Sequence, residues 1–178
     1  ELFLKNGGMK GRQVDYITNG TYKINKHLFD VKIEKMTIIE ENKVGIITAL
    51  DGLPLTPGQI AGPEIHGHNN FQDFETFLKH GGQRGLQTQV ILSGSYNINP
   101  WAITIEQVAM TEIPIGHVGV VISYVGEEGK DVTGEQFKHG NLVSRGQKGV
   151  WVDTFGPGKY GLNTRTIKTE LVPTTNLV

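Results

Sequence analysis

The sequence predicts an all-β fold with one or two short helices, built as tandem small antiparallel β modules. Three observations predict it. Gly accounts for 24 of the 178 residues, which is about 13% where an average protein has roughly 7%. Short segments rich in β-branched and aromatic residues are bounded by Gly, Pro or Asn, as in small β barrels and sandwiches. The third observation is an internal repeat, the signature of modular architectures.

The repeat has two parts at a fixed spacing. The first part, Gly-x-Lys/Arg-Gly, starts at Gly8, Gly82 and Gly146. The second part, Gly-x-Tyr-x-x-Asn, starts at Gly20, Gly94 and Gly158. Gly supplies a positive φ in a tight turn, the Tyr ring is buried while its hydroxyl reaches a backbone partner, and Asn caps its own turn. Each copy therefore predicts a strand, a Gly turn, a Tyr-bearing strand, an Asn turn and a further strand.

The copies start 74 and 64 residues apart, and this spacing sets the predicted modules. We expect a first β module at residues 1–81, a second at 82–145, and the start of a third at 146–178. Within them, alternating apolar residues predict strands. The predicted strands are residues 14–17, 29–33, 44–49, 90–92, 103–105, 118–125, 150–152 and 167–172.

One helix is predicted inside the first module. Asn70 is the expected N-cap of a helix over residues 71–80, with Phe74, Phe77 and Leu78 on one stripe and a Gly pair ending it. The corresponding segment of the second module, residues 133–140, is shorter and has room for a turn or two. The ten-residue difference between the two offsets lies here.

Composition excludes several classes of protein. The 17 Lys and Arg against 18 Asp and Glu give a net charge of −1, whereas a nucleic-acid-binding protein normally carries a basic excess. The absence of Cys excludes disulfide scaffolds and thiolate zinc sites. No apolar run has the ~20 residues of a membrane-spanning helix. We therefore expect a soluble fragment, which opens at Glu1 without a signal-peptide pattern.

The strongest candidate for chemistry is the loop that contains Glu64, His66 and His68, with Asp73 nearby. Two imidazoles and a carboxylate are a plausible metal-ligand set. Pro63 and neighbouring Gly residues favour a polar loop that caps the helix instead, and a metal- or ligand-binding β domain stays an alternative.

The remaining candidates also favour structure over chemistry. The stretch 51–58 is expected to be an extended connector, with a substrate-binding loop or a polyproline ligand as alternatives. Trp101 and Trp151 are expected to pack rather than to stack on a sugar. The sequence lacks a phosphate-binding loop and a nucleophile elbow. We therefore predict no enzyme, no cofactor, and no catalytic, cofactor-binding or metal residues.

Several segments carry a family resemblance. Residues 111–121, Thr-Glu-Ile-Pro-Ile-Gly-His-Val-Gly-Val-Val, resemble the opening sequence of SPFH (Band 7, flotillin- and stomatin-like) proteins. The resemblance runs from about Gly8 onward and is closest to the N-terminal region of long bacterial SPFH-domain proteins. The other segments that carry it are 57–63, 97–101, 137–142, 146–160 and 171–176.

The resemblance implies a fragment of a membrane-associated scaffold that organises membrane or protein assemblies in bacteria, with residues 146–178 leading into the SPFH domain. In the full-length protein it implies partners that are membrane lipids and further copies of the chain. The 178 residues alone are expected to be monomeric or weakly associated. Tandem β repeats before an SPFH-like domain also resemble the major vault protein, so a module that builds the wall of a large particle is the alternative.

Overall fold

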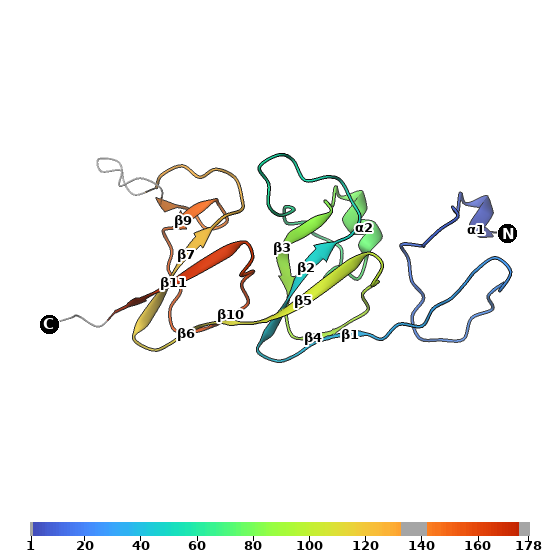
Figure 1. The fold of residues 1–178 in the computed structure, drawn as a ribbon, viewed down its shortest axis with the longest axis horizontal. Helices are drawn as coiled ribbons and strands as arrows, with labels where there is room; N and C mark the ends of the chain where they lie inside the picture. Colours follow the sequence, from blue (N-terminus) through green and yellow to red (C-terminus); the bar gives the residue numbers. More distant parts are fainter. Residues whose placement is uncertain (1, 133–141, 175–178) are drawn as a thin grey trace.

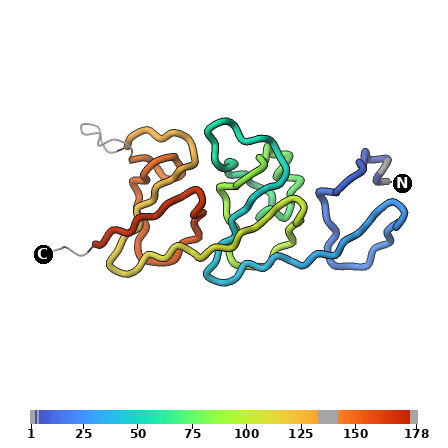
Figure 2. Tube along the Cα trace, in the orientation of Figure 1, coloured from blue at the N-terminus to red at the C-terminus, as the bar shows by residue number. Residues whose placement is uncertain are grey.

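A computed structural model describes residues 2–132 and 142–174 and has an elongated shape (Figure 1). The fold is all-β, as predicted. In the described part, the helices are α1 (Leu2–Lys5) and α2 (Phe74–Lys79), and no helix has the length and apolar composition needed to cross a bilayer. The N-terminal residues, a middle module and a C-terminal module follow one another along the long axis (Figure 2).

The middle module spans residues 37–109 and has a three-stranded antiparallel sheet. Its central strand β2 (Lys43–Ala49) lies between β3 (Gly85–Ile91) and β5 (Ile103–Ala109). A separate two-stranded ribbon joins β1 (Thr37–Ile39) to β4 (Gly94–Tyr96).

The C-terminal module spans residues 111–173 and repeats this arrangement. Its central strand β7 (His117–Ser123) lies between β9 (Gly149–Trp151) and β11 (Ile167–Pro173). A ribbon joins β6 (Thr111–Ile113) to β10 (Gly158–Tyr160). An additional strand, β8 (Leu142–Val143), runs parallel to β9.

The strand pairing confirms the repeat and locates its units. Strands β6 and β7 follow β1 and β2 by 74 residues, and β9, β10 and β11 follow β3, β4 and β5 by 64. The expected boundaries at 81/82 and 145/146 both fall inside a sheet, because each central strand precedes the boundary and its neighbours follow it. The folded units are offset from the predicted modules because Gly-x-Lys/Arg-Gly marks the start of β3 and of β9, and not the start of a unit.

The Gly turn and the Tyr hydroxyl of the repeat behave as predicted in the middle and C-terminal modules, whereas the Tyr rings, predicted to be buried, are only half-buried. Gly94 has a φ of +154° and Gly158 one of +152°. The hydroxyl of Tyr96 donates to the carbonyl of Leu92 at 3.1 Å, and that of Tyr160 donates to the carbonyl of Gly156 at 3.0 Å. In both modules the Tyr ring thus lies over its Gly and fastens the turn to the preceding residues.

Helix α2 starts later than predicted. Its N-cap is Asp73, whose Oδ1 accepts the Thr76 backbone N–H at 2.9 Å. Asn70 does not cap the helix, because residues 69–71 have positive φ and form a left-handed loop before it. The helix and this loop deliver three aromatic rings to the core of the middle module, from Phe71, Phe74 and Phe77. The predicted counterpart, residues 133–140, lies outside the described residues.

The N-terminal segment, residues 8–36, differs from its prediction. Residues 14–17 and 29–33 form no strands in the described part of the chain, whereas the prediction for 44–49 is confirmed by β2. By the repeat, residues 11–35 correspond to β3, β4 and β5 of the middle module. The trace follows a similar open path in both (Figure 2). The predicted strands lack the hydrogen bonds that a central strand equivalent to β2 supplies in a complete module.

Candidate functional site

The best candidate site is the contact between consecutive repeats. Asn99 and Asn163 occupy the same place in the repeat, in the turn after the Tyr-bearing strand. The Oδ1 of Asn99 accepts the backbone N–H of Trp101, and the Oδ1 of Asn163 accepts that of Arg165, both at 3.0 Å. This self-capping of the turn is what the sequence predicted.

The amide nitrogens of the same side chains reach into the preceding repeat. Asn163 Nδ2 donates to the carbonyls of Gln87 at 2.7 Å and Thr88 at 3.3 Å. Asn99 Nδ2 donates to the carbonyls of residues 14 and 13, at 3.0 and 3.3 Å. Because residues 13 and 14 precede 87 and 88 by 74 positions, the two contacts are the same contact made twice. We call them the first joint (Asn99) and the second joint (Asn163).

Both Asn side chains are buried, with 9% of Asn99 and 2% of Asn163 exposed. Buried amides and carbonyls are costly to leave unpaired, at about 1–3 kcal/mol each. Each joint therefore fixes the turn of one repeat against a strand position of the repeat before it. Asn25, their counterpart in the N-terminal segment, is exposed and caps only its own turn, by accepting the His27 N–H at 3.0 Å.

The residue two positions after the Asn also contacts the preceding repeat, and the kind of contact differs between the two joints. In the first joint, the Trp101 ring packs under the Arg12 guanidinium, 3.8 Å from the ring centroid, and near the Lys32 ammonium at 5.5 Å. In the second joint, Arg165 binds Glu106 through two hydrogen bonds, of 2.5 and 3.2 Å. Lys32 and Glu106 are counterparts, so both joints use the same two repeat positions.

Electrostatics supports the second joint. The hydrogen bond from Arg165 lowers the pKa of Glu106, and the same bond raises the pKa of Arg165. About half of each side chain is exposed, so water and salt screen the pair. The pair orients the joint more than it stabilises it.

Close packing completes the second joint. A Cβ built on Gly161 would lie 2.6 Å from Leu92 Cδ2 and 3.0 Å from Val44 Cγ1. Lys159 Nζ donates to Asn42 Oδ1 at 3.0 Å. A larger residue at position 161 is therefore disfavoured by the approach of the two modules, and not by its backbone conformation.

The Glu64–His66–His68 loop, for which metal binding was the alternative to a polar loop, has a structural role. His68 is 4% exposed; its Nδ1 accepts the Phe71 backbone N–H at 2.7 Å, and its Nε2 donates to the Ile65 carbonyl at 2.7 Å. Asp73 caps α2, while Glu64 and His66 are exposed. Within residues 2–132 and 142–174, no group of three or more His, Cys, Asp or Glu side chains is placed to hold a metal ion. His68 thus stabilises the left-handed loop through hydrogen bonds at both of its ring nitrogens.

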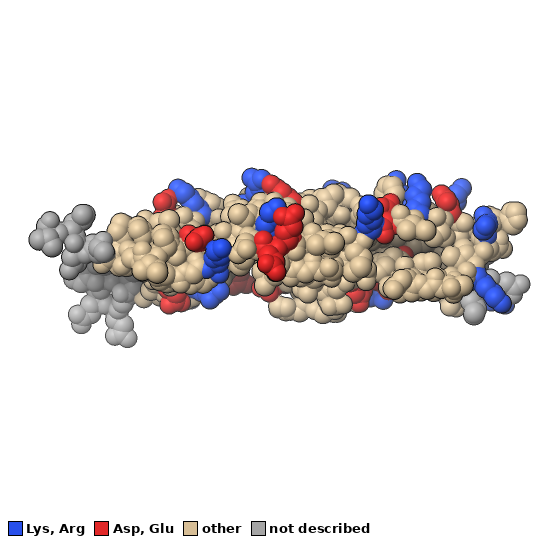
Figure 3. Space-filling view, turned by 90° about the horizontal axis from the view of Figure 1, so that it is seen from below, with Lys and Arg blue, Asp and Glu red and all other residues tan. Residues whose placement is uncertain are grey.

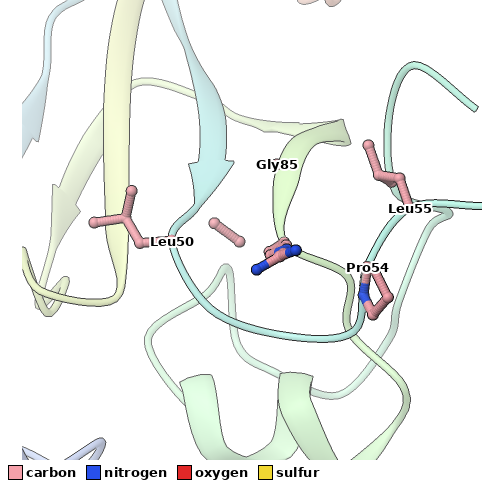
Figure 4. A pocket seen from close by; sticks show the side chains of 6 residues that line it. Leu50, Pro54, Leu55 and Gly85 are labelled. Carbon is pink, nitrogen blue, oxygen red and sulfur yellow. The ribbon is translucent and has the colours of Figure 1, made fainter.

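The stretch 51–58 is extended only in part: residues 51–52 bend, Leu53 forms a bridge to Gln83, and a turn begins at Thr56, whose carbonyl accepts the Gln59 N–H. It borders an open hollow of about 470 Å³. Figure 4 shows Leu50 at the end of β2 and Pro54 and Leu55 on the following loop, around Gly85. Arg84 contributes the charged group among the lining residues. The other lining residues are apolar or Gly.

The two Trp residues and the surface charges also match structural roles. Trp151 is 7% exposed and packs in the core of its module, whereas Trp101 is 41% exposed and belongs to the first joint. Basic and acidic side chains are interspersed over the face seen in Figure 3. This distribution agrees with the net charge of −1.

Sequence reasoning identified Asn25, Asn99 and Asn163 as repeat residues but assigned them only to their own turns. The signal that points further is that the Asn recurs in all copies although its turn function is open to Ser, Asp or Gly. A comparison of the chain with protein-family models, curated proteins and solved structures finds no match.

Proposed function

We propose that this chain is a rigid, repeat-built spacer within a scaffold protein, and that this scaffold is of the membrane-associated, SPFH-like kind. The observation that carries the proposal is the recurrence of one inter-repeat contact, made by Asn99 and again by Asn163. Independent β domains do not require a buried amide contact between them, so its occurrence at two successive junctions indicates that the repeats are held together.

The physical consequence of the joints is a fixed angle between neighbours. In repeat proteins each unit contacts only its neighbours, and interface terms add to the stability of each unit. A buried Asn with both its oxygen and its nitrogen bonded restrains the rotation of one module about the next. A spacer built in this way holds its two ends at a set distance, which is what an assembly scaffold requires.

The proposal is tested by measuring the distance across the second joint. Because the chain has no Cys, spin labels attach cleanly at Thr104→Cys and Lys168→Cys, one exposed position in each module. We expect a narrow distance distribution, and a broader one when Asn163→Ala is added. A matched pair within one module, Ser93→Cys with Thr104→Cys, should stay narrow in both backgrounds. A broad distribution across the joint in the unaltered background contradicts a rigid spacer.

Membrane attachment is tested separately, by vesicle flotation and light scattering. The near-neutral charge lacks a basic face that holds an anionic bilayer. We therefore expect the 178 residues to be monomeric or weakly associated and not to float with vesicles. The full-length protein should form large oligomers and float with vesicles. A large ring or particle wall formed by the 178 residues alone would instead favour the vault-like alternative.

A further inference from the structure

The N-terminal segment has the parts of a module that surround a central strand. Its residues 11–17 correspond to β3, residues 20–22 to β4, and residues 29–35 to β5. In the middle module, β2 lies between β3 and β5 and pairs with both. In the C-terminal module, β7 does the same between β9 and β11. The repeat therefore reserves a place for one more strand, between residues 11–17 and 29–35.

Apolar side chains at this place are exposed where their counterparts are buried. Ile17 is 52% exposed, and its counterpart Ile91 is 1% exposed. Leu28 is 58% exposed, whereas the corresponding Ala102 and Thr166 are 6% and 0% exposed. Exposed apolar groups at positions that a strand covers elsewhere in the same chain mark an interaction surface.

The described residues supply no strand for this place. Both edges of β2 and both edges of β7 are paired within their own sheets, so within residues 2–132 and 142–174 neither is available. Helix α1 covers one position, because the Phe3 ring packs edge-on against Phe29 with centroids 5.2 Å apart. Ile17 and Leu28 remain exposed beside it.

We propose that residues 11–35 are a strand acceptor, and that its occupant is a strand of the β2 type from a further module of this same repeat. The strand binds as the central strand, antiparallel to residues 11–17 on one side and to residues 29–35 on the other. Backbone hydrogen bonds provide affinity, and alternate side chains provide specificity, as in other cases of strand addition. The proposal rests on the repeat and not on the scaffold function.

The required sequence of the occupant follows from β2 and β7. Both carry Val-Gly followed by two β-branched residues, at positions 44–47 and 118–121. A Cβ on Gly45 would lie 2.7 Å from Ile91 Cγ1 and 2.9 Å from Ile105 Cγ2. The corresponding acceptor residues are Ile17, identical to Ile91, and Val31, which is β-branched like Ile105 but one methylene smaller. The acceptor therefore requires Gly at the second position of this motif.

The test uses the complete chain and a peptide with the sequence of residues 36–50, and measures amide hydrogen exchange by NMR. Alternate amides of residues 29–35 and 13–17 should exchange at least about tenfold more slowly when peptide is saturating. A peptide with Gly45→Val should bind at least about tenfold more weakly, because it cannot approach Ile17 and Val31. In the chain, Ile17→Ser should weaken binding by a similar factor while leaving the exchange of β2 and β7 unchanged.

A tethered version removes any dependence on peptide solubility. Residues 36–50 are fused ahead of residue 1 through a Gly/Ser linker of about 15 residues, with Gly45→Val in the fused copy as the control. The same amides should be protected only in the Gly-containing fusion. The proposal is overturned by unchanged exchange in both formats, by equal protection with the Gly45→Val sequence, or by a response confined to β3 and β5, which would mean that the peptide replaces β2 itself.

Discussion

The two joints share one buried side chain and differ in what surrounds it. In both, an Asn amide donates to two carbonyls of the preceding repeat. Two residues later, the first joint has Trp101 beneath two cations, whereas the second has the Arg165–Glu106 ion pair. The comparison teaches that the Asn sets the geometry between repeats. The position two residues later accepts different kinds of contact, a cation–π contact in the first joint and an ion pair in the second.

The largest effect is expected from removing the shared side chain. Asn163→Ala leaves the buried Gln87 carbonyl and the half-buried Thr88 carbonyl without the amide that donates to them and should lower the free energy of unfolding by about 2–3 kcal/mol. Asn99→Ala should cost less, about 1–2 kcal/mol, because Asn99 is more exposed and its acceptors belong to a segment without paired strands. Urea denaturation measures both.

Asn25→Ala is the matched control, since Asn25 makes the turn bond without a joint. It should cost no more than about 1 kcal/mol, the value of a single hydrogen bond. If the three Asn→Ala variants lose equal free energy of unfolding, the Asn side chains stabilise only their own turns and the joints contribute no stability.

A smaller effect is expected from crowding the second joint. Gly161→Val places carbon atoms against Leu92 and Val44 and should cost about 1–2 kcal/mol. The cost stays moderate because the Leu92 side chain is 53% exposed and has room to move. Gly156→Val is the control, since a Cβ there meets nothing within 4 Å. Thermal melts that rank the two variants equally would contradict close packing at the joint.

A still smaller effect is expected at the variable position of the first joint. Trp101→Ala removes the ring that Arg12 and Lys32 contact, and an exposed cation–π contact contributes about 0.5–1 kcal/mol. Trp101→Phe should retain part of it because the ring face remains. If Trp101→Ala and Trp101→Phe are equally destabilising in urea, the cations do not contribute and the indole packs for its size alone.

The strands and the repeat were predictable because their signals are local. Alternation over 44–49 and 118–125, and the Gly-x-Tyr spacing, predicted β2, β7 and the turns. The start of α2 was not predictable in this way, since Asn69, Asn70 and Asp73 are all capable caps. The choice of Asp73 depends on His68, which accepts the Phe71 N–H while residues 69–71 are in a left-handed conformation. The His68 ring is itself placed by Gln89, whose Oε1 lies 3.3 Å from Nε2, and Gln89 is 21 positions away in the sequence.

The joints were beyond sequence reasoning for a different reason. The Oδ1 bond of each Asn lies within its own turn, and local rules predict it. The Nδ2 bonds cross 85 and 76 positions of sequence, from Asn99 to Val14 and from Asn163 to Gln87. Their existence depends on how one module docks on the next, which alternation and turn rules leave open. The same limit explains why residues 14–17 and 29–33 were predicted as strands: alternation identifies a strand but not whether its partner is present.

The smallest effect separates the joints by pH. Glu106 has a lowered pKa because Arg165 donates hydrogen bonds to it. Its contribution to stability is therefore complete above the pKa of an unfolded Glu, about 4.3, and is lost as the pH falls through the lowered value of the folded state. The first joint has no carboxylate in its Trp101 contact. Unfolding free energies of the unaltered chain and Glu106→Gln should thus differ at neutral pH and converge once the pH lies below the lowered pKa of Glu106. The difference between the unaltered chain and Trp101→Ala should persist there.

Salt is a second test of the ion pair. At about 1 M salt, where charges are screened beyond roughly 3 Å, the stability difference between the unaltered chain and Glu106→Gln should become smaller at neutral pH. A Glu106→Gln difference that survives in acid would show that the side chain acts by packing, and that the two joints differ in shape alone.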